Sequence, residues 1–260
     1  MTRYKITLEY DGRNTVGWQA QGAGADLPSI QGLVQEAMFQ FCKRHVEVSS
    51  AGRTDAGVHA IAMAASFDLE NTGHNPDTIM RAMNFYLRQM AAPVSVLSCE
   101  SVADDFHARF SCKRRNYRYI ILNRRAPVIL DNGMTWWIPR DLDIEKMRAA
   151  AAKLLGNHDW TSFRSSECQS KSPVKTLDRA DIEICDMAFG ESGEMQGRYI
   201  IMNFSAKSFL HHQVRNIVGT LVDIGLGKPH DIDKIFASKS RAAAGPTAPA
   251  YGLYFVSAEY

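Results

Sequence analysis

The sequence lacks the cysteine patterns of a disulfide-bonded or zinc-binding protein. Its five cysteines are odd in number, widely scattered and without a C-x-x-C pair. Disulfide frameworks and structural zinc sites depend on paired, regularly spaced cysteines, so neither is expected. The pattern is typical of a protein of the reducing cytoplasm, and we expect a cytoplasmic location.

Long apolar runs are missing as well. No stretch approaches the roughly 18 apolar residues that a membrane-spanning helix needs. The opening residues, MTRYKITLEYDG, alternate between polar and apolar side chains, which is typical of a strand and not of a signal peptide. No membrane partner is therefore expected.

The chain also has no G-x-x-x-x-G-K-[ST] loop that would cradle the phosphates of a nucleotide. Its adjacent histidines, His211 and His212, have poor spacing for metal ligands, because ligands on a helix face the same way when they lie four residues apart. We expect these two side chains to cap a helix or to face phosphate.

What is present is an ordinary globular composition. The chain has 260 residues, of which 45% are hydrophobic and 22% charged, with a net charge of +2. This length predicts one large domain or two small ones with a real core. So small a net charge says little about partners, and the clustering of charge is more informative.

Hydrophobic periodicity predicts the order β-α-β-β-α-β in the first hundred residues. Residues 3–10 alternate strictly, and Ser29 precedes a helical pattern as its expected N-cap. The other expected elements are strands at 46–50, 58–68 and 94–102 and a helix at 77–87. This is the order of a ferredoxin-like, split βαβ unit.

The second half repeats this mixture of strands and helices. Asp143 is placed to cap a helix that Gly156 is expected to stop. The remaining expected elements are strands at 116–123, 179–186, 198–206 and 252–260 and a helix at 211–227. We therefore predict an α+β protein of duplicated architecture, with 1–105 and 106–260 as its two parts.

One candidate for chemistry is the loop SAGRTDAGVH at 50–59, which holds Asp55 between two glycines. A plain turn with an exposed Arg53–Asp55 pair is one reading, because Asp and Gly are favoured in turns. The other is a carboxylate kept ionised by the neighbouring guanidinium, which would lower its pKa, and used as a nucleophile or base.

A second candidate is the stretch FHARFSCKRRNYRYIILN at 106–123. Between 109 and 118 it carries five basic residues and no acid: Arg109, Lys113, Arg114, Arg115 and Arg118. In a strand Tyr117 and Tyr119 would share one face and Asn116 and Arg118 the other. Such a pattern is typical either of nucleic-acid binding, where aromatic rings stack on bases, or of a solvated strand with core tyrosines.

Two further stretches stand out. In FLHHQVRNIVG at 209–219, Arg215 lies beside an apolar helical stripe, where an arginine usually has an acidic partner, and Asp55 is a candidate. YDGRNTVGWQAQ at 10–21 reads locally as a strand-to-helix connection with a packing Trp18, although a ligand loop would have a similar composition.

Together and in this order, these stretches resemble the tRNA pseudouridine synthase A family. The resemblance covers nearly the whole chain, and GRTDAGVHA is a highly specific string. The matching stretches are YDG…GWQ.Q at 10–21, GRTDAGVHA at 52–60, FHARFS..RR.YRY at 106–119, LLGNHDWTSF at 154–163, FLHHQVRNIVG at 209–219 and AP.YGLYFV at 248–256. The chain departs from the family pattern at Leu87-Arg88 and at Asn116.

The resemblance implies a role for each of several residues. Asp55 would be the catalytic aspartate, and Arg53 would help to flip the target nucleotide or fill its place. Tyr117 would stack on the uracil, Arg215 would pair with Asp55, and Leu253 would line the base pocket. Independently of the resemblance, the residue pattern favours RNA contacts by the basic residues of 109–118 and a phosphate-facing role for His211. No cofactor or metal is implied.

The resemblance also implies a substrate and an architecture. The substrate would be uridine at positions 38, 39 and 40 of the tRNA anticodon arm, bound by a homodimer in which one tRNA touches both subunits. Two ferredoxin-like-derived halves would combine their antiparallel sheets into one extended sheet, with helices on one side and an RNA-binding cleft on the other.

Pseudouridine formation breaks the N1–C1′ bond, turns the base and joins C5 to C1′. Because the base is stacked in RNA, the nucleotide must first be extruded, at a cost of a few kcal/mol. Asp55 would attack C1′ or remove the 2′ proton, and both routes stay open. Two other functions also stay open: a non-catalytic RNA-binding protein, and an N-glycosylase or nucleoside hydrolase that uses the same aspartate.

Overall fold

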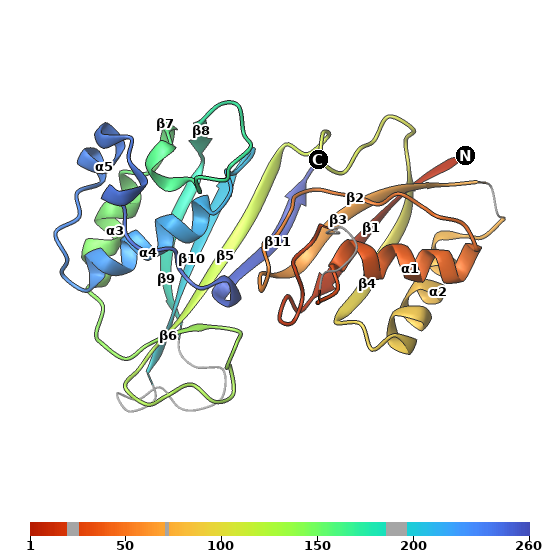
Figure 1. Cartoon of the computed structure of the whole chain (residues 1–260), viewed down its shortest axis with the longest axis horizontal. Coiled ribbons are helices and arrows are strands. Elements are labelled where there is room, and N and C mark those ends of the chain that lie inside the picture. Colours follow the sequence, from red (N-terminus) through yellow and green to blue (C-terminus); the bar gives the residue numbers. More distant parts are fainter. Residues whose placement is uncertain (20–25, 71–72, 186–196) are drawn as a thin grey trace. The chain divides into compact units, whose positions relative to one another are not determined.

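The computed structural model describes residues 1–19, 26–70, 73–185 and 197–260 (Figure 1). The end of the YDG…GWQ.Q stretch and the last residue of the expected strand 179–186 lie outside these ranges. The chain forms two compact units, a first unit of Met1–Arg115 with Tyr254–Tyr260 and a second unit of Asn116–Leu253. Each unit combines helices with a mostly antiparallel set of strands, so the predicted α+β class is confirmed.

The first unit has the predicted β-α-β-β-α-β order. Its elements are β1 (Thr2–Tyr10), α1 (Ile30–Cys42), β2 (Ser49–Ser50), β3 (His59–Leu69), α2 (Pro76–Gln89) and β4 (Val94–Val102). The strands lie in the order β4-β1-β3, and β2 pairs antiparallel with β3. The closing strand β11 (Leu253–Glu259) pairs in parallel with the start of β3, where Tyr254 lies opposite His59.

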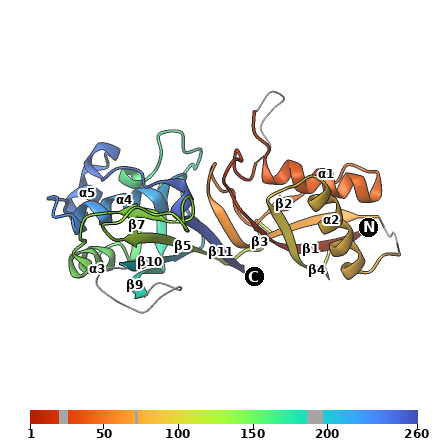
Figure 2. The same ribbon diagram turned by 90° about the horizontal axis from the view of Figure 1, so that it is seen from below.

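Alternation along β1 explains the core of this unit. The apolar side chains of β1 are buried on one face of the sheet, which α1 and α2 cover (Figure 2). Ser29 caps α1 as predicted, with its Oγ accepting from the amide of Gly32 at 3.0 Å. The expected strand 46–50 is shorter than predicted, because only Ser49 and Ser50 form the ladder with β3.

The second unit is built on the strands β5-β10-β9, with β6 parallel to β5. Its main elements are β5 (Arg114–Asn123), β6 (Trp136–Ile138), α3 (Ile144–Ala152), β9 (Arg179–Cys185), β10 (Arg198–Ala206) and α4 (Gln213–Gly225). Helix α4 is buried along nearly its whole length, which is typical of a central core helix. Helix α3 packs against α4 and β9.

Two details of this unit correct the sequence predictions. Asp143 caps α3 as expected, but the helix ends at Ala152 and not at Gly156. Gly156, with φ of +98°, instead begins β7 (Gly156–Asp159), which pairs with β8 (Val174–Leu177). The hairpin and the short helix α5 (Ile232–Ser238) had no predicted counterpart. In the described part of the chain no helix is long and apolar enough to cross a membrane.

Candidate active site

Asp55 lies in the loop 51–58 that joins β2 to β3 in the first unit. The loop opens with a hydrogen bond from the Ala51 amide to the Ala64 carbonyl at 2.8 Å. It closes with a turn in which the Val58 amide donates to the Asp55 carbonyl at 3.1 Å, and Gly57 takes a φ of +81°. Because the loop is tied to β3 at both ends, the half-buried carboxylate has a fixed backbone.

Thr54, directly before Asp55, is held through both its side chain and its backbone. Its hydroxyl lies 2.8 Å from the hydroxyl of Tyr10, and its carbonyl accepts from the Trp18 amide at 3.1 Å. Tyr10, Trp18 and Thr54 are all buried. The peptide that leads into Asp55 is thus anchored at two points.

Two glycines let residues 10–18 lie directly against this loop. A Cβ on Gly17, whose φ is +91°, would stand 2.4 Å from the Thr54 carbonyl oxygen. A Cβ on Gly12 would stand 2.1 Å from the Val58 carbonyl oxygen. Trp18 packs as the sequence predicted, but sequence reasoning missed the contact with the Asp55 loop. The available signal was the pair of glycines, since close backbone approach requires that residue type.

A charged cluster lies at the far end of the loop. The Nδ1 of buried His59 is 3.1 Å from the Gly12 amide and 3.2 Å from Asp11 Oδ1, and its ring stacks on Tyr254 at 4.9 Å. Burial alone would raise the pKa of Asp11, but hydrogen bonds from Arg13 outweigh it and lower that pKa. The cluster therefore places a carboxylate at the junction of the loop with β3.

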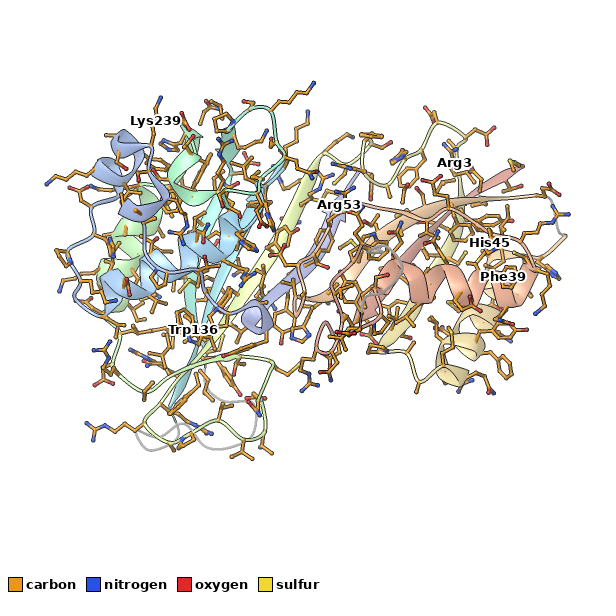
Figure 3. All side chains as sticks on the ribbon, in the orientation of Figure 1. Arg3, Phe39, His45, Arg53, Trp136 and Lys239 are labelled. Carbon is orange, nitrogen blue, oxygen red and sulfur yellow. The ribbon has the colours of Figure 1, made fainter. Side chains whose placement is uncertain are left out.

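Arg53 is exposed on the Asp55 loop (Figure 3) and forms no hydrogen bond or ion pair with any described residue. The basic stretch approaches the same loop: Arg115 Nε donates to the Ala51 carbonyl and its Nη2 to the Arg109 carbonyl, both at 2.8 Å. Lys113 and Arg109 are exposed, and Arg109 lies over the Phe110 ring. In the first unit, then, Arg53 stands on the Asp55 loop itself, and Arg115 holds the first residue of that loop.

In the second unit, β5 shows the alternation that the sequence predicted. Tyr117 and Tyr119 are buried on one face, where Tyr117 meets Phe209 edge to face at 5.1 Å. Asn116 and Arg118 lie on the other face. There Asn116 accepts from the Ser205 hydroxyl at 2.5 Å, and Arg118 Nε donates to the Asn203 side chain at 3.1 Å. Arg118 is thus already part of a polar surface network.

The helix α4 carries Arg215 near its start. Arg215 Nε donates to the Ala248 carbonyl at 2.8 Å, and the Ala248 amide donates back to the Arg215 carbonyl at 3.1 Å. His212 occupies the N-cap position in a left-handed conformation, with φ of 61°, but its side chain makes no capping hydrogen bond. The expectation of a capping side chain is therefore wrong for His212. The His211 carbonyl accepts from Ser165 at 2.9 Å.

The segment 241–252 covers α4 and leads into Leu253. Arg241 donates to the Asn216 side chain at 2.9 Å, and the Gly245 amide donates to the Thr220 hydroxyl at 2.9 Å. Further along, the Pro249 carbonyl accepts from Tyr119 at 2.8 Å. Burial raises the pKa of Tyr119 well above its usual range, so its hydroxyl keeps this proton. The segment thus fixes both the Arg215 guanidinium and the buried Leu253 within the second unit.

Comparison with known proteins gives one consistent result. The model of a tRNA pseudouridine synthase family matches residues 6–111 and 150–260, which include the Asp55 loop and the segment that leads into Leu253. A tRNA pseudouridine synthase A of Rhodospirillum centenum is 51% identical over 262 residues, covering 100% of both chains. Proteins of the same description from Ehrlichia ruminantium and Bartonella tribocorum are 46% and 43% identical, over 99% and 100% of each chain.

Proposed function

Because the chain belongs to the tRNA pseudouridine synthase family, whose members are isomerases, we propose that it converts uridine to pseudouridine at positions 38, 39 and 40 of the tRNA anticodon arm. The observation that carries the proposal is the construction of the Asp55 loop. Its carboxylate is half-buried on a backbone fixed at both ends, and the guanidinium of Arg53 stands exposed two residues away. A carboxylate so held can approach one atom of a bound nucleotide repeatedly in the same geometry.

Asp55 acts on the ribose of the target nucleotide. Either it attacks C1′, or it removes the 2′ proton, and in both routes the N1–C1′ bond breaks with its electron pair on the uracil. The base then turns and C5 bonds to C1′; in the first route this breaks the Asp55–C1′ bond and frees the carboxylate, and in the second Asp55 returns the proton to C2′. C5 gives up its proton and N1 gains one, so the product is an isomer of the substrate and needs no co-reactant.

The proposal assigns the binding of the target nucleotide to four further residues: Arg53, Tyr117, Arg215 and Leu253. Extrusion of a stacked base costs a few kcal/mol, which binding must offset. Arg53 fits the vacated space or the adjoining phosphate, because its planar fork has no partner among the described residues. Tyr117 provides an aromatic face for the uracil, Leu253 an apolar wall and Arg215 a counter-charge for the carboxylate.

Phosphate contacts of the tRNA are assigned to the basic stretch and to His211. Within the basic stretch, Arg109 and Lys113 are the better candidates for phosphate contacts, because they are exposed and have no acidic partner among the described residues. Arg114 already pairs with Glu259, Arg115 with the Ala51 carbonyl and Arg118 with Asn203. We further propose that the protein works in the cytoplasm as a homodimer.

Chemical mapping of pseudouridine in tRNA after incubation with the protein tests this function. The proposal predicts new pseudouridines confined to positions 38 to 40, with the RNA mass unchanged. Free uracil and abasic sites would instead identify a glycosylase. Tight tRNA binding with no modified position would identify a binding protein.

A further inference from the structure

The hydroxyl pair of Tyr10 and Thr54 is a buried side-chain hydrogen bond between the Asp55 loop and the rest of the first unit. Tyr10 is 5% exposed and Thr54 7%, and their oxygens lie 2.8 Å apart, so one hydroxyl donates to the other. Tyr10 is the last residue of β1, a strand paired on both sides, and it is therefore a rigid support.

We infer that the Tyr10 hydroxyl is a positioning group for Asp55, an inference that rests on the proposed function. The Thr54 carbonyl is held by the Trp18 amide and the Thr54 side chain by Tyr10. Gly17 lies against the third side of this segment, since a Cβ there would meet the Thr54 carbonyl oxygen and the peptide between Asp55 and Ala56. With these contacts in place, the Cα of Asp55 has one position relative to the sheet.

A second tyrosine on the same strand shows that the hydroxyl is not required for packing. Tyr4 is also buried on the helix-facing side of β1, and its ring stacks on Phe67 at 5.7 Å. Its hydroxyl has no hydrogen bond to any described residue. A tyrosine can therefore fill this face through its ring alone, whereas at Tyr10 the hydroxyl meets the residue that precedes the catalytic aspartate.

The inference predicts a specific kinetic signature. The variant Tyr10→Phe keeps the ring and removes one oxygen, so kcat should fall by roughly tenfold because the Asp55 carboxylate is no longer held in its reactive position. The KM for tRNA and the tRNA affinity should stay within about twofold, since Tyr10 is buried and cannot touch RNA. A purely structural role would instead lower thermal stability and leave kcat unchanged well below the melting temperature.

The experiment compares five variants at saturating tRNA, using tritium release from uracil labelled at C5. Thr54→Val should match Tyr10→Phe, and Thr54→Ser, which keeps the hydroxyl, should retain most of the wild-type kcat. The double variant Tyr10→Phe with Thr54→Val should be no worse than either single variant, because both remove the same contact. Tyr4→Phe is the matched control and should be indistinguishable from wild type.

A wild-type kcat for Tyr10→Phe, or additive losses in the double variant, would overturn the inference. The variant Asp55→Asn separates this result from the proposed function. If Asp55→Asn is inactive while Tyr10→Phe is normal, only the positioning role fails. If Asp55→Asn turns over normally, the proposed function itself fails.

Discussion

Arg215 and Ala248 exchange two hydrogen bonds, Nε to carbonyl oxygen at 2.8 Å and amide to carbonyl oxygen at 3.1 Å. The pair joins the start of α4 to the segment that carries Leu253 in the second unit. The Nε of the Arg215 guanidinium is thereby hydrogen-bonded to the backbone, which fixes the direction in which its two terminal nitrogens point. The substrate-binding role proposed for Arg215 depends on this orientation as well as on its charge.

The variant Arg215→Lys keeps the charge but has no Nε to reach Ala248. We expect kcat/KM for tRNA to fall at least tenfold and the free energy of unfolding to fall by about 1 kcal/mol, the usual net value of one hydrogen bond. The matched control is Arg148→Lys, since Arg148 Nε also donates to a backbone carbonyl, that of Ile182, at 3.1 Å. The control should lose similar stability and no activity; equal kinetics for both variants would contradict the prediction.

Arg53→Lys tests whether a planar fork is needed on the Asp55 loop. A lysine offers only a point charge, so activity on tRNA should fall by more than tenfold while the unfolding midpoint stays unchanged, because the exposed Arg53 supports no described contact. The control is Arg81→Lys, an exposed arginine on α2 that pairs with Asp77. Unaltered single-turnover rates for Arg53→Lys would remove Arg53 from the proposed site.

Gly219 has a packing role that helix propensity alone would miss. Alanine in place of a helical glycine normally stabilises by about 1 kcal/mol. A Cβ on Gly219, however, would stand 1.7 Å from the Pro246 carbonyl oxygen, so Gly219→Ala should destabilise the protein by about 1–3 kcal/mol.

Urea denaturation with Gly32→Ala as control measures this effect. The Cβ of that control would stand 2.9 Å from the capping Ser29 Oγ, a side-chain atom that need shift by only a few tenths of an ångström and can keep its hydrogen bond, and the stability should change by less than about 1 kcal/mol. A Gly219→Ala protein as stable as the control would show that the segment 241–252 does not pack tightly on α4.

Cys99 should be protected from alkylation. It lies opposite Ile6 in the β1–β4 ladder, and burial raises the pKa of its thiol to about 12. Because the thiolate is the reactive form, Cys99 should label slowly with iodoacetamide at pH 8 in the native protein and quickly in guanidinium chloride. Peptide mass spectrometry distinguishes the two rates, and equal labelling before and after unfolding would contradict the partial burial of the Cys99 thiol.

The sequence predicted those helices and strands whose local residue pattern, a cap or an alternation of polar and apolar side chains, is enough to identify them. Ser29 and Asp143 were recognised as caps because their side chains act on amides three residues away, and β1 through its strict alternation. The end of α3 was misplaced at Gly156 because a glycine with positive φ serves a strand start as readily as a helix end. The hairpin of β7 and β8 was missed because its pairing joins segments that are distant in sequence.

In the candidate site, too, local sequence signals were readable and contacts between separate segments were not. Asp55 and Arg53 could be singled out as candidates from the sequence because their loop is a compact, glycine-bounded motif, and their roles stay predictions. The support that Tyr10, Trp18 and Gly17 give to that loop was not found, because it depends on contacts across some forty residues of chain. Only the fold brings the two stretches together.

The chemistry assigned to Asp55 is tested most directly by single-turnover tritium release from tRNA labelled at uracil C5, with wild type and Asp55→Asn compared at equal bound tRNA. Asparagine has the same shape but neither attacks C1′ nor accepts a proton. The account predicts tritium release by the wild type and none by Asp55→Asn, with folding and tRNA affinity retained. Release by Asp55→Asn at the wild-type rate would contradict it.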